Sequence, residues 1–292
     1  MPEGNTVWLT ARALRTALAG RPLTQAELRT PELATIDLVG QCVVDVAPRG
    51  KHLLIRLEPA LTLHTHLRMD GRWRIHRAGS QVHDPDDHVR VILGNTVGTA
   101  VGWRVHDVAL VPTSAEDTLV GHLGPDLLGP DWDADEAIRR LRLDPGRAIG
   151  EALLDQRNLA GAGNVYKAEI CFLRGISPWT PVGDVRDIAG LVDLAHRLLL
   201  ANRERFDHVT TGDPRAGKRT WVYDRAGRPC RRCGATIHVD SQGAALAGAV
   251  THALAPPART SPAPPATRLS YWCPRCQPGP SPEASAAQKP RA

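Results

Sequence analysis

The sequence predicts a multidomain α+β protein, and three observations lead to this fold class. A helical pattern opens the chain, a run of short β-branched segments follows it, and four cysteines in two close pairs lie towards the end. We therefore expect an N-terminal helix with an antiparallel β-sandwich or flattened barrel, then a helical domain, then a four-cysteine zinc finger. The 292 residues suffice for domains that each have a core of their own.

The first predicted element is a helix over residues 2–19. Apolar side chains recur there at helical spacing, and Gly20 is a good terminator. Pro2 falls at or just before the first turn, where its missing N–H is harmless. The positive end of the helix dipole favours the acidic side chain of Glu3.

Short β-branched segments separated by turn residues occupy the chain from about residue 35 to residue 111. This alternation of short β-branched segments and turn residues is typical of antiparallel strands, and Gly94-Asn95 suits a hairpin turn. We expect strands at 42–47, 53–57, 61–67, 73–76, 88–93 and 96–111. Histidines 52, 64 and 66 show no tight metal spacing, so we treat them as polar strand residues.

Helical patterns dominate after a loop rich in Gly, Pro and Asp. Helices are expected at 135–143, 148–156, 164–173 and 185–206. The predicted domains are 1–115 for the β-sandwich, 116–221 for the helical domain and 222–277 for the zinc finger. A low-complexity insert at 241–267 and a tail at 278–292 are expected to be disordered.

The cysteine pairs are Cys230-x-x-Cys233 and Cys273-x-x-Cys276. Two such pairs complete a tetrahedral site for one structural zinc ion, and four thiolates leave no open position for catalysis. The gap between the pairs exceeds the usual span of roughly 15–20 residues because it contains the insert. A looped-out segment costs little closure entropy. The alternative is two unrelated redox pairs.

Composition restricts the partners and the compartment. The net charge is +5 and the isoelectric point is about 9.1, which is compatible with phosphate-bearing partners. We see no apolar run of membrane-spanning length and no secretory signal. We therefore expect a cytoplasmic protein without a membrane partner.

The chain begins Met1-Pro2-Glu3. Once the initiator is removed, the secondary amine of Pro2 is able to attack a carbonyl or anomeric carbon and form an iminium. Glu3 is then positioned to transfer protons. The alternative is a coincidental Met-Pro start.

Phosphate-binding features recur along the chain. Gly161, Gly163 and Asn164 form a small-residue turn before a helix start, where free N–H groups suit a phosphate. Read alone, the segment is better explained as a tight helix–helix turn with Asn164 as its N-cap. Lys51 in a hairpin turn and Arg268 near the second cysteine pair are further candidates, against the alternative of solvated side chains.

An apolar side chain lies at the tip of another predicted turn. Met69, beside Arg68, is suited to wedge between bases, and we expect Arg68 to contact DNA from the same tip. The alternative for Met69 is ordinary packing beneath the loop.

Taken together and in this order, the motifs resemble the formamidopyrimidine-DNA glycosylase/endonuclease VIII family of bifunctional base-excision repair enzymes. The Pro2-Glu3-Gly4 start, the hairpin Lys51, the helix–two-turn–helix signature at 155–169 and the zinc-finger end at 268–277 all match. The resemblance covers about residues 1–277, apart from the insert.

The resemblance implies a role for each matched position. Pro2 would form a Schiff base with deoxyribose, and Glu3 would be the acid/base that opens the sugar. Lys51 would grip a phosphate and support β-elimination. Asn164 would hold backbone phosphate, and Arg268 would clamp phosphates and support δ-elimination. Met69 would fill the gap that the flipped nucleotide leaves. The implied partner is damaged double-stranded DNA, bound by a monomer in the cytoplasm at the nucleoid.

Two departures bear on the branch of the family. Asn5 replaces the aspartate most common in the endonuclease VIII branch, and residues 100–105 lack the Arg-Arg-Phe-Gly segment of the formamidopyrimidine branch. The second departure favours endonuclease VIII and oxidised pyrimidines, and it leaves two wedge residues unassigned. The alternatives are the same chemistry on oxidised purines, a non-catalytic zinc-finger DNA-binding protein, and a zinc-stabilised scaffold that does not bind nucleic acid.

Overall fold

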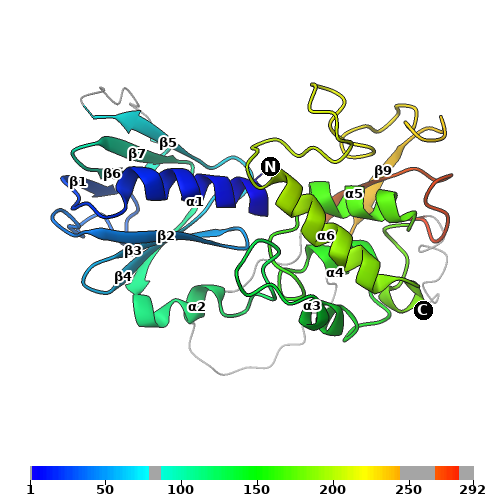
Figure 1. Cartoon of the computed structure of the whole chain (residues 1–292), viewed down its shortest axis with the longest axis horizontal. Helices are drawn as coiled ribbons and strands as arrows, with labels where there is room; N and C mark the ends of the chain where they lie inside the picture. Colours follow the sequence, from blue (N-terminus) through cyan, green and yellow to red (C-terminus); the bar gives the residue numbers. More distant parts are fainter. Residues whose placement is uncertain (1, 79–86, 244–266, 283–292) are drawn as a thin grey trace. The chain divides into compact units, whose positions relative to one another are not determined.

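A computed structural model describes residues 2–78, 87–243 and 267–282 (Figure 1). The chain divides into two compact units, which we treat separately. Unit 1 comprises Met1–Arg140, Asp155–Gly163 and Val192–His208, and unit 2 comprises Leu141–Leu154, Asn164–Leu191 and Val209–Ala292. This division is not contiguous in sequence, and it does not follow the boundary expected after residue 115.

Unit 1 contains the predicted N-terminal helix and β-sandwich. Helix α1 spans Gly4–Leu18, so it begins two residues later than expected and Pro2 lies just before its first turn. Two four-stranded antiparallel sheets follow, ordered β1-β6-β7-β5 (sheet 1) and β2-β3-β4-β8 (sheet 2). Sheet 1 consists of β1 (Gln25–Leu28), β5 (Arg72–Arg77), β6 (Val89–Gly94) and β7 (Gly98–Trp103). Sheet 2 consists of β2 (Val43–Arg49), β3 (His52–Leu57), β4 (Leu61–His66) and β8 (Asp107–Pro112).

The core of unit 1 lies between α1 and the facing sides of the strands. Val7 and Leu14 of α1 pack in one cluster with Ile55 of sheet 2 and Leu93 of sheet 1, and all four are fully buried. The outer face of sheet 2 carries a smaller cluster of its own, which contains Leu54. The expected sandwich is thus confirmed.

Two strand predictions need correction. Strand β1 was not expected, because Gln-Ala-Glu-Leu has no β-branched residue; it forms through pairing with β6. The strand expected at 96–111 is two strands, because Arg104 adopts a left-handed backbone conformation with φ of 49° and turns the chain between β7 and β8.

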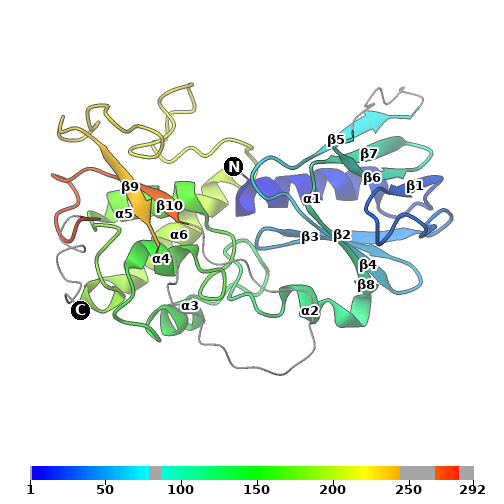
Figure 2. The same cartoon turned by 180° about the vertical axis from the view of Figure 1, so that it is seen from behind.

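The remaining elements are short helices and one hairpin. They are a 3-10 turn (Thr113–Ala115), α2 (Asp117–Val120), α3 (Ala134–Leu141), α4 (Ile149–Leu154), α5 (Asn164–Arg174), a 3-10 turn (Val182–Asp184) and α6 (Ile188–Asn202). Strands β9 (His238–Gln242) and β10 (Arg268–Trp272) pair antiparallel in unit 2 (Figure 2). Within the described parts of the chain, no helix has the length and apolar character that a membrane crossing requires.

The expected insert at 241–267 starts too early. Ser241 and Gln242 belong to β9, and Gln242 is buried, with its side-chain Nε2 donating to the Pro178 carbonyl at 2.7 Å. The rest of that prediction, residues 244–266, lies outside the described residues, as does the tail from 283 onward. At the start of the tail, the Pro280 carbonyl accepts a hydrogen bond from Ser177.

Candidate active site and metal centre

Residues near the start of the chain are hydrogen-bonded to the turn at 156–163. Glu3 is fully buried, and its carboxylate Oε2 accepts a hydrogen bond of 2.7 Å from the backbone N–H of Gly163. The next residue, Gly4, donates its backbone N–H to the Gly161 carbonyl at 2.9 Å. Pro2, which is half-buried, therefore leads into two fixed residues. Pro2 is therefore bonded directly to a residue whose buried carboxylate is hydrogen-bonded to this turn.

Two positions of this turn require glycine, Gly163 because Glu3 packs against it and Gly161 because of its backbone conformation. A Cβ at Gly163 would lie 2.5 Å from the carboxyl carbon of Glu3, and Gly161 has a φ of 105°. Gln156 braces the turn from within, because its side chain accepts from the Gly161 N–H at 3.0 Å and donates to the Ala162 carbonyl at 2.9 Å. The backbone N–H groups of Gly161 and Gly163, which we expected to be free for a phosphate, therefore donate to Gln156 and Glu3 instead.

Lys51 occupies the turn between β2 and β3, as expected. The preceding residue, Gly50, has a φ of 57° and donates its N–H to Asp126 Oδ2 at 2.7 Å. Asp126 is 2% exposed, and its other oxygen accepts from the Leu128 N–H at 3.0 Å. Burial raises the pKa of Asp126, and these two hydrogen bonds oppose that rise. Sequence reasoning missed this anchor, because nothing in the sequence links Asp126 to a turn so distant along the chain.

His208 is a second titratable group that the sequence did not single out. Burial lowers its pKa; the charge of Glu3 opposes that change and the charge of Lys51 adds to it. His208 is therefore close enough to both side chains to interact with their charges, and it is neutral at pH 7.

Three histidines of sheet 2 gather next to the Lys51 turn. His52 Nδ1 lies 2.8 Å from His64 Nε2, and the His52 ring centroid lies 4.9 Å from that of His66. Burial lowers the pKa of His52 to about 2, and that of both His64 and His66 to about 4. The prediction of polar strand residues missed this cluster, since it arises from strand register: His52 is the direct partner of His66.

The loop between β4 and β5 carries Met69 and Arg68. Met69 is 53% exposed, as a wedge would be. Arg68 has a φ of 52°, and its guanidinium Nε forms an ion pair of 2.6 Å with Asp107 of β8. The ion pair ties Arg68 to its own sheet, although its side chain stays 56% exposed, so both Arg68 and Met69 are exposed at the tip.

In unit 2, helix α5 holds the strand that carries Arg268. Asn164, the first residue of α5, donates from Nδ2 to the carbonyl of Leu269 at 2.9 Å. Lys167 is fully buried and donates to the same carbonyl at 3.2 Å and to Ser270 Oγ at 2.6 Å. The Asn164 side chain thus links α5 to β10, which the sequence did not indicate. It binds the carbonyl of Leu269, the residue that follows Arg268 on the strand.

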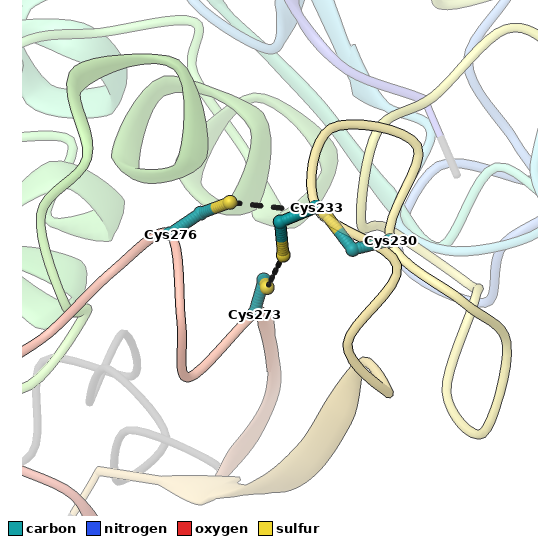
Figure 3. A group of neighbouring side chains, drawn as sticks. All are labelled: Cys230, Cys233, Cys273 and Cys276. Carbon is teal, nitrogen blue, oxygen red and sulfur yellow. Dashed lines mark hydrogen bonds between the residues drawn. The ribbon is translucent and has the colours of Figure 1, made fainter.

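The four predicted metal ligands converge in unit 2 (Figure 3). The sulfur atoms of Cys230, Cys233, Cys273 and Cys276 all lie within 4.8 Å of one another. The Cys233–Cys273 and Cys230–Cys276 sulfur separations are 3.5 and 3.9 Å. A tetrahedron with metal–sulfur distances of about 2.3 Å has edges of about 3.8 Å, so these four residues are in position to bind one metal ion.

The pKa values of the cysteine thiols are shifted in opposite directions by their surroundings. A hydrogen bond from the backbone of Ala235 lowers the pKa of Cys233 to about 7, whereas burial raises that of Cys276 to about 12. Four thiolates this close together need a cation among them, and a divalent ion stabilises each in its deprotonated form.

Comparison with known proteins agrees with this architecture. Residues 1–108 match the family model described as the formamidopyrimidine-DNA glycosylase N-terminal domain. A Streptomyces coelicolor protein named "Probable endonuclease 8 2" is 51% identical over 285 residues, covering 97% of this chain and 96% of its own. The Mycolicibacterium smegmatis "DNA-(apurinic or apyrimidinic site) lyase Nei2" is 42% identical over 277 residues, covering 95% of this chain and 99% of its own.

A solved structure shows the same fold. The Lactococcus lactis Fpg in complex with DNA containing an abasic site superposes with a TM-score of 0.73 at 22% identity, over 95% of this chain and 100% of that one. The chain belongs to the formamidopyrimidine-DNA glycosylase/endonuclease VIII family. Within that family it falls in the endonuclease VIII branch, and it is a DNA glycosylase and abasic-site lyase of base-excision repair.

Proposed function

We propose that the chain removes oxidised pyrimidines from double-stranded DNA through a Schiff base formed by Pro2, after loss of Met1. The observation that carries the proposal is the buried carboxylate of Glu3. It is held by the Gly163 N–H at 2.7 Å, immediately after Pro2. A structural scaffold would gain nothing from burying an acid beside a proline at the start of the chain, whereas a proton-transfer step requires one.

The amine and the acid divide the first step between them. The Pro2 nitrogen attacks C1′ of the damaged nucleotide and the bond from C1′ to the base breaks; the base takes that electron pair together with the proton lost by the amine. Glu3 protonates the ring oxygen of the sugar, so the ring opens and the nitrogen–carbon bond becomes an iminium. The iminium then acidifies the C2′ proton. The Glu3 carboxylate, which has given up its proton to the ring oxygen, takes the C2′ proton, so that the 3′ phosphate is expelled; a further elimination expels the 5′ phosphate.

Phosphate contacts position the substrate for these steps. Lys51 grips a phosphate beside the lesion and favours β-elimination, because its turn is fixed through Gly50 and Asp126. Arg268 clamps a phosphate and favours δ-elimination. Both roles need a side chain that starts from an immobile backbone.

The helical turn and the β4–β5 tip complete the DNA contacts. The backbone N–H of Asn164, at the start of α5, binds backbone phosphate, whereas the N–H groups of Gly161 and Gly163 already donate to Gln156 and Glu3. Met69 enters the space that the flipped nucleotide vacates, which its 53% exposure allows. Arg68 contacts DNA from the same tip.

The metal is one structural zinc ion held by the four cysteines. It supplies a rigid base for the β9–β10 hairpin, and none of the proposed steps uses it as a reactant. We further propose that the protein acts as a monomer on nucleoid DNA in the cytoplasm.

The preference for pyrimidines follows from the endonuclease VIII branch and from strand β7, which reads Gly-Thr-Ala-Val-Gly-Trp in place of the expected purine-branch segment. Borohydride trapping on duplexes with thymine glycol, 8-oxoguanine or an abasic site tests the whole proposal. We expect covalent adducts with thymine glycol and abasic DNA, and weaker trapping with 8-oxoguanine. Equal or stronger trapping with 8-oxoguanine would assign the enzyme to purines.

Two controls isolate the nucleophile. Pro2→Thr and an enzyme acetylated at its N-terminus are both expected to give no adduct. Full trapping by the acetylated enzyme, or mass spectrometry showing Met1 retained on active protein, would refute the role of Pro2.

A further inference from the structure

The outer face of sheet 1 presents a tryptophan between two arginines. The guanidinium carbon of Arg72 lies 4.0 Å from the centroid of the Trp103 ring, and that of Arg104 lies 4.4 Å from it. Arg72 and Trp103 are direct partners in the pairing of β5 with β7. Stacking of this kind restricts the guanidinium plane and leaves its N–H edge available for hydrogen bonding.

The charge of Arg104 is already neutralised. Its Nη1 forms an ion pair of 3.0 Å with Asp70, and its Nη2 lies 2.9 Å from His88 Nε2. The second oxygen of Asp70 is 2.9 Å from His106. Arg104 therefore holds Trp103 in place and ties the β7–β8 turn to the loop that contains Met69.

Arg72 and Arg74 leave an unbalanced positive charge. Both are exposed, and among the described residues neither forms an ion pair. They share one face of β5 at alternate positions, while the intervening Trp73 packs against the core cluster. Two positions along a strand span about 7 Å, which is comparable to the spacing of successive phosphates on one DNA strand.

We propose that Arg72 and Arg74 bind consecutive phosphates of duplex DNA outside the lesion pocket, with Trp103 as the platform that orients Arg72. The occupant is DNA because two unneutralised guanidinium groups at this spacing suit a regular polyanion. The inference rests on the proposed activity on DNA, and it adds a contact surface to that activity.

The salt dependence of binding tests the proposal. Affinity for an undamaged duplex and for an abasic duplex would be measured by fluorescence anisotropy over a salt range of roughly 50 to 200 mM. Each phosphate contact contributes about 0.9 to the slope of log K against log salt. We expect Arg72→Ala and Arg74→Ala each to reduce the slope by about 1, and the double variant to reduce it by about 2.

Arg77→Ala is the matched control, because Arg77 is exposed on the same strand but lies on its opposite face. It removes the same charge and is expected to leave the slope unchanged. Arg72→Lys should keep the slope and lose only part of the affinity, since it retains the charge without the stacked plane. Should Arg72→Ala fail to fold, Arg74→Ala carries the comparison.

Equal slopes for Arg74→Ala, Arg77→Ala and the unsubstituted protein would overturn the proposal. Trapping at saturating enzyme separates this outcome from failure of the proposed chemistry. If the surface is wrong, adducts still form and the slopes agree. If the role of Pro2 is wrong, adducts do not depend on a free N-terminus, whatever the slopes.

Discussion

The buried carboxylate of Asp126 accepts a hydrogen bond of 2.7 Å from the backbone N–H of Gly50, directly before Lys51. Replacing Asp126 with Ala removes this bond and the bond from Leu128. We expect a loss of about 1.5–3 kcal/mol in the free energy of unfolding, because charged hydrogen bonds of this kind are worth that much. Nicking of abasic DNA should slow by roughly tenfold or more as the Lys51 turn loosens.

Asp131→Ala is the control for Asp126→Ala. Asp131 forms an ion pair of 2.6 Å with Arg49 near the same hairpin, but its side chain is 53% exposed. Such surface pairs contribute about 0–1 kcal/mol, so activity should stay close to normal. Urea unfolding and gel-based nicking rates would be compared; similar losses in both variants would show that the anchor has no special role.

Gly163→Ala is expected to disable the enzyme without unfolding it. The added Cβ would lie 2.5 Å from the Glu3 carboxyl carbon, so the buried acid must move. A displacement of about 1 Å in a catalytic group costs on the order of 100-fold in rate. Gly146→Ala is the matched control, since its Cβ would come no closer than 4.0 Å to Asp144. Single-turnover base excision measures both, and equal rates would contradict the placement of Glu3.

Stability should fall as the pH drops from about 6.5 to about 5. His52, His64 and His66 stay neutral in the folded chain because their pKa values are lowered to about 2, 4 and 4, whereas the unfolded chain takes up protons near pH 6.5. The contribution of these neutral histidines to the free energy of unfolding is therefore fully present above about pH 6.5. Below that pH, each of them lowers the free energy of unfolding by up to about 1.4 kcal/mol per pH unit.

His64→Gln retains a hydrogen-bonding side chain next to His52 but does not titrate. We expect its unfolding free energy to change less steeply with pH than that of the unsubstituted protein, by about 1.4 kcal/mol per unit. Chemical denaturation at half-unit steps measures both curves. Superimposable curves would show that His64 is not held neutral by the fold.

Removal of the metal should disorder the β9–β10 hairpin. Trp272 at its end is 6% exposed, and its ring centroid lies 4.7 Å from that of Trp179. A strong chelator should therefore change tryptophan fluorescence and release about one zinc ion per chain. Cys273→Ser should bind no zinc, while Cys42→Ser, outside the cluster, should bind it normally. Zinc retained by Cys273→Ser would disprove the four-cysteine site.

Local patterns predicted much of this molecule. Helix α1, most strands and the metal ligands follow from periodicity and spacing, since each depends on residues that are close in sequence. Strand β1 was missed because its sequence has no strand preference and it forms only against β6. The turn at Arg104 was missed because a left-handed arginine is fixed there by Asp70 and His88.

In the site too, the sequence predicted residues that stand out locally but not the contacts made between distant parts of the chain. Pro2 and Glu3 were recognisable from their residue types at the start of the chain, whereas Lys51 was singled out by its match to the hairpin lysine of the family. Their supports were not, because Asp126 and His208 reach them only through the folded chain. The tie between Asn164 and Leu269 likewise joins residues 105 positions apart.

The register of β9 and β10 has a practical consequence. Gln242 and Arg268 are direct partners, so the hairpin itself sets the distance between the two ends of the intervening segment. The entropic penalty of closing such a connection rises only slowly with its length. A fluorescent reporter or affinity label grafted between these strands should therefore leave the cysteine cluster intact, and it would provide a handle for observing single molecules on DNA.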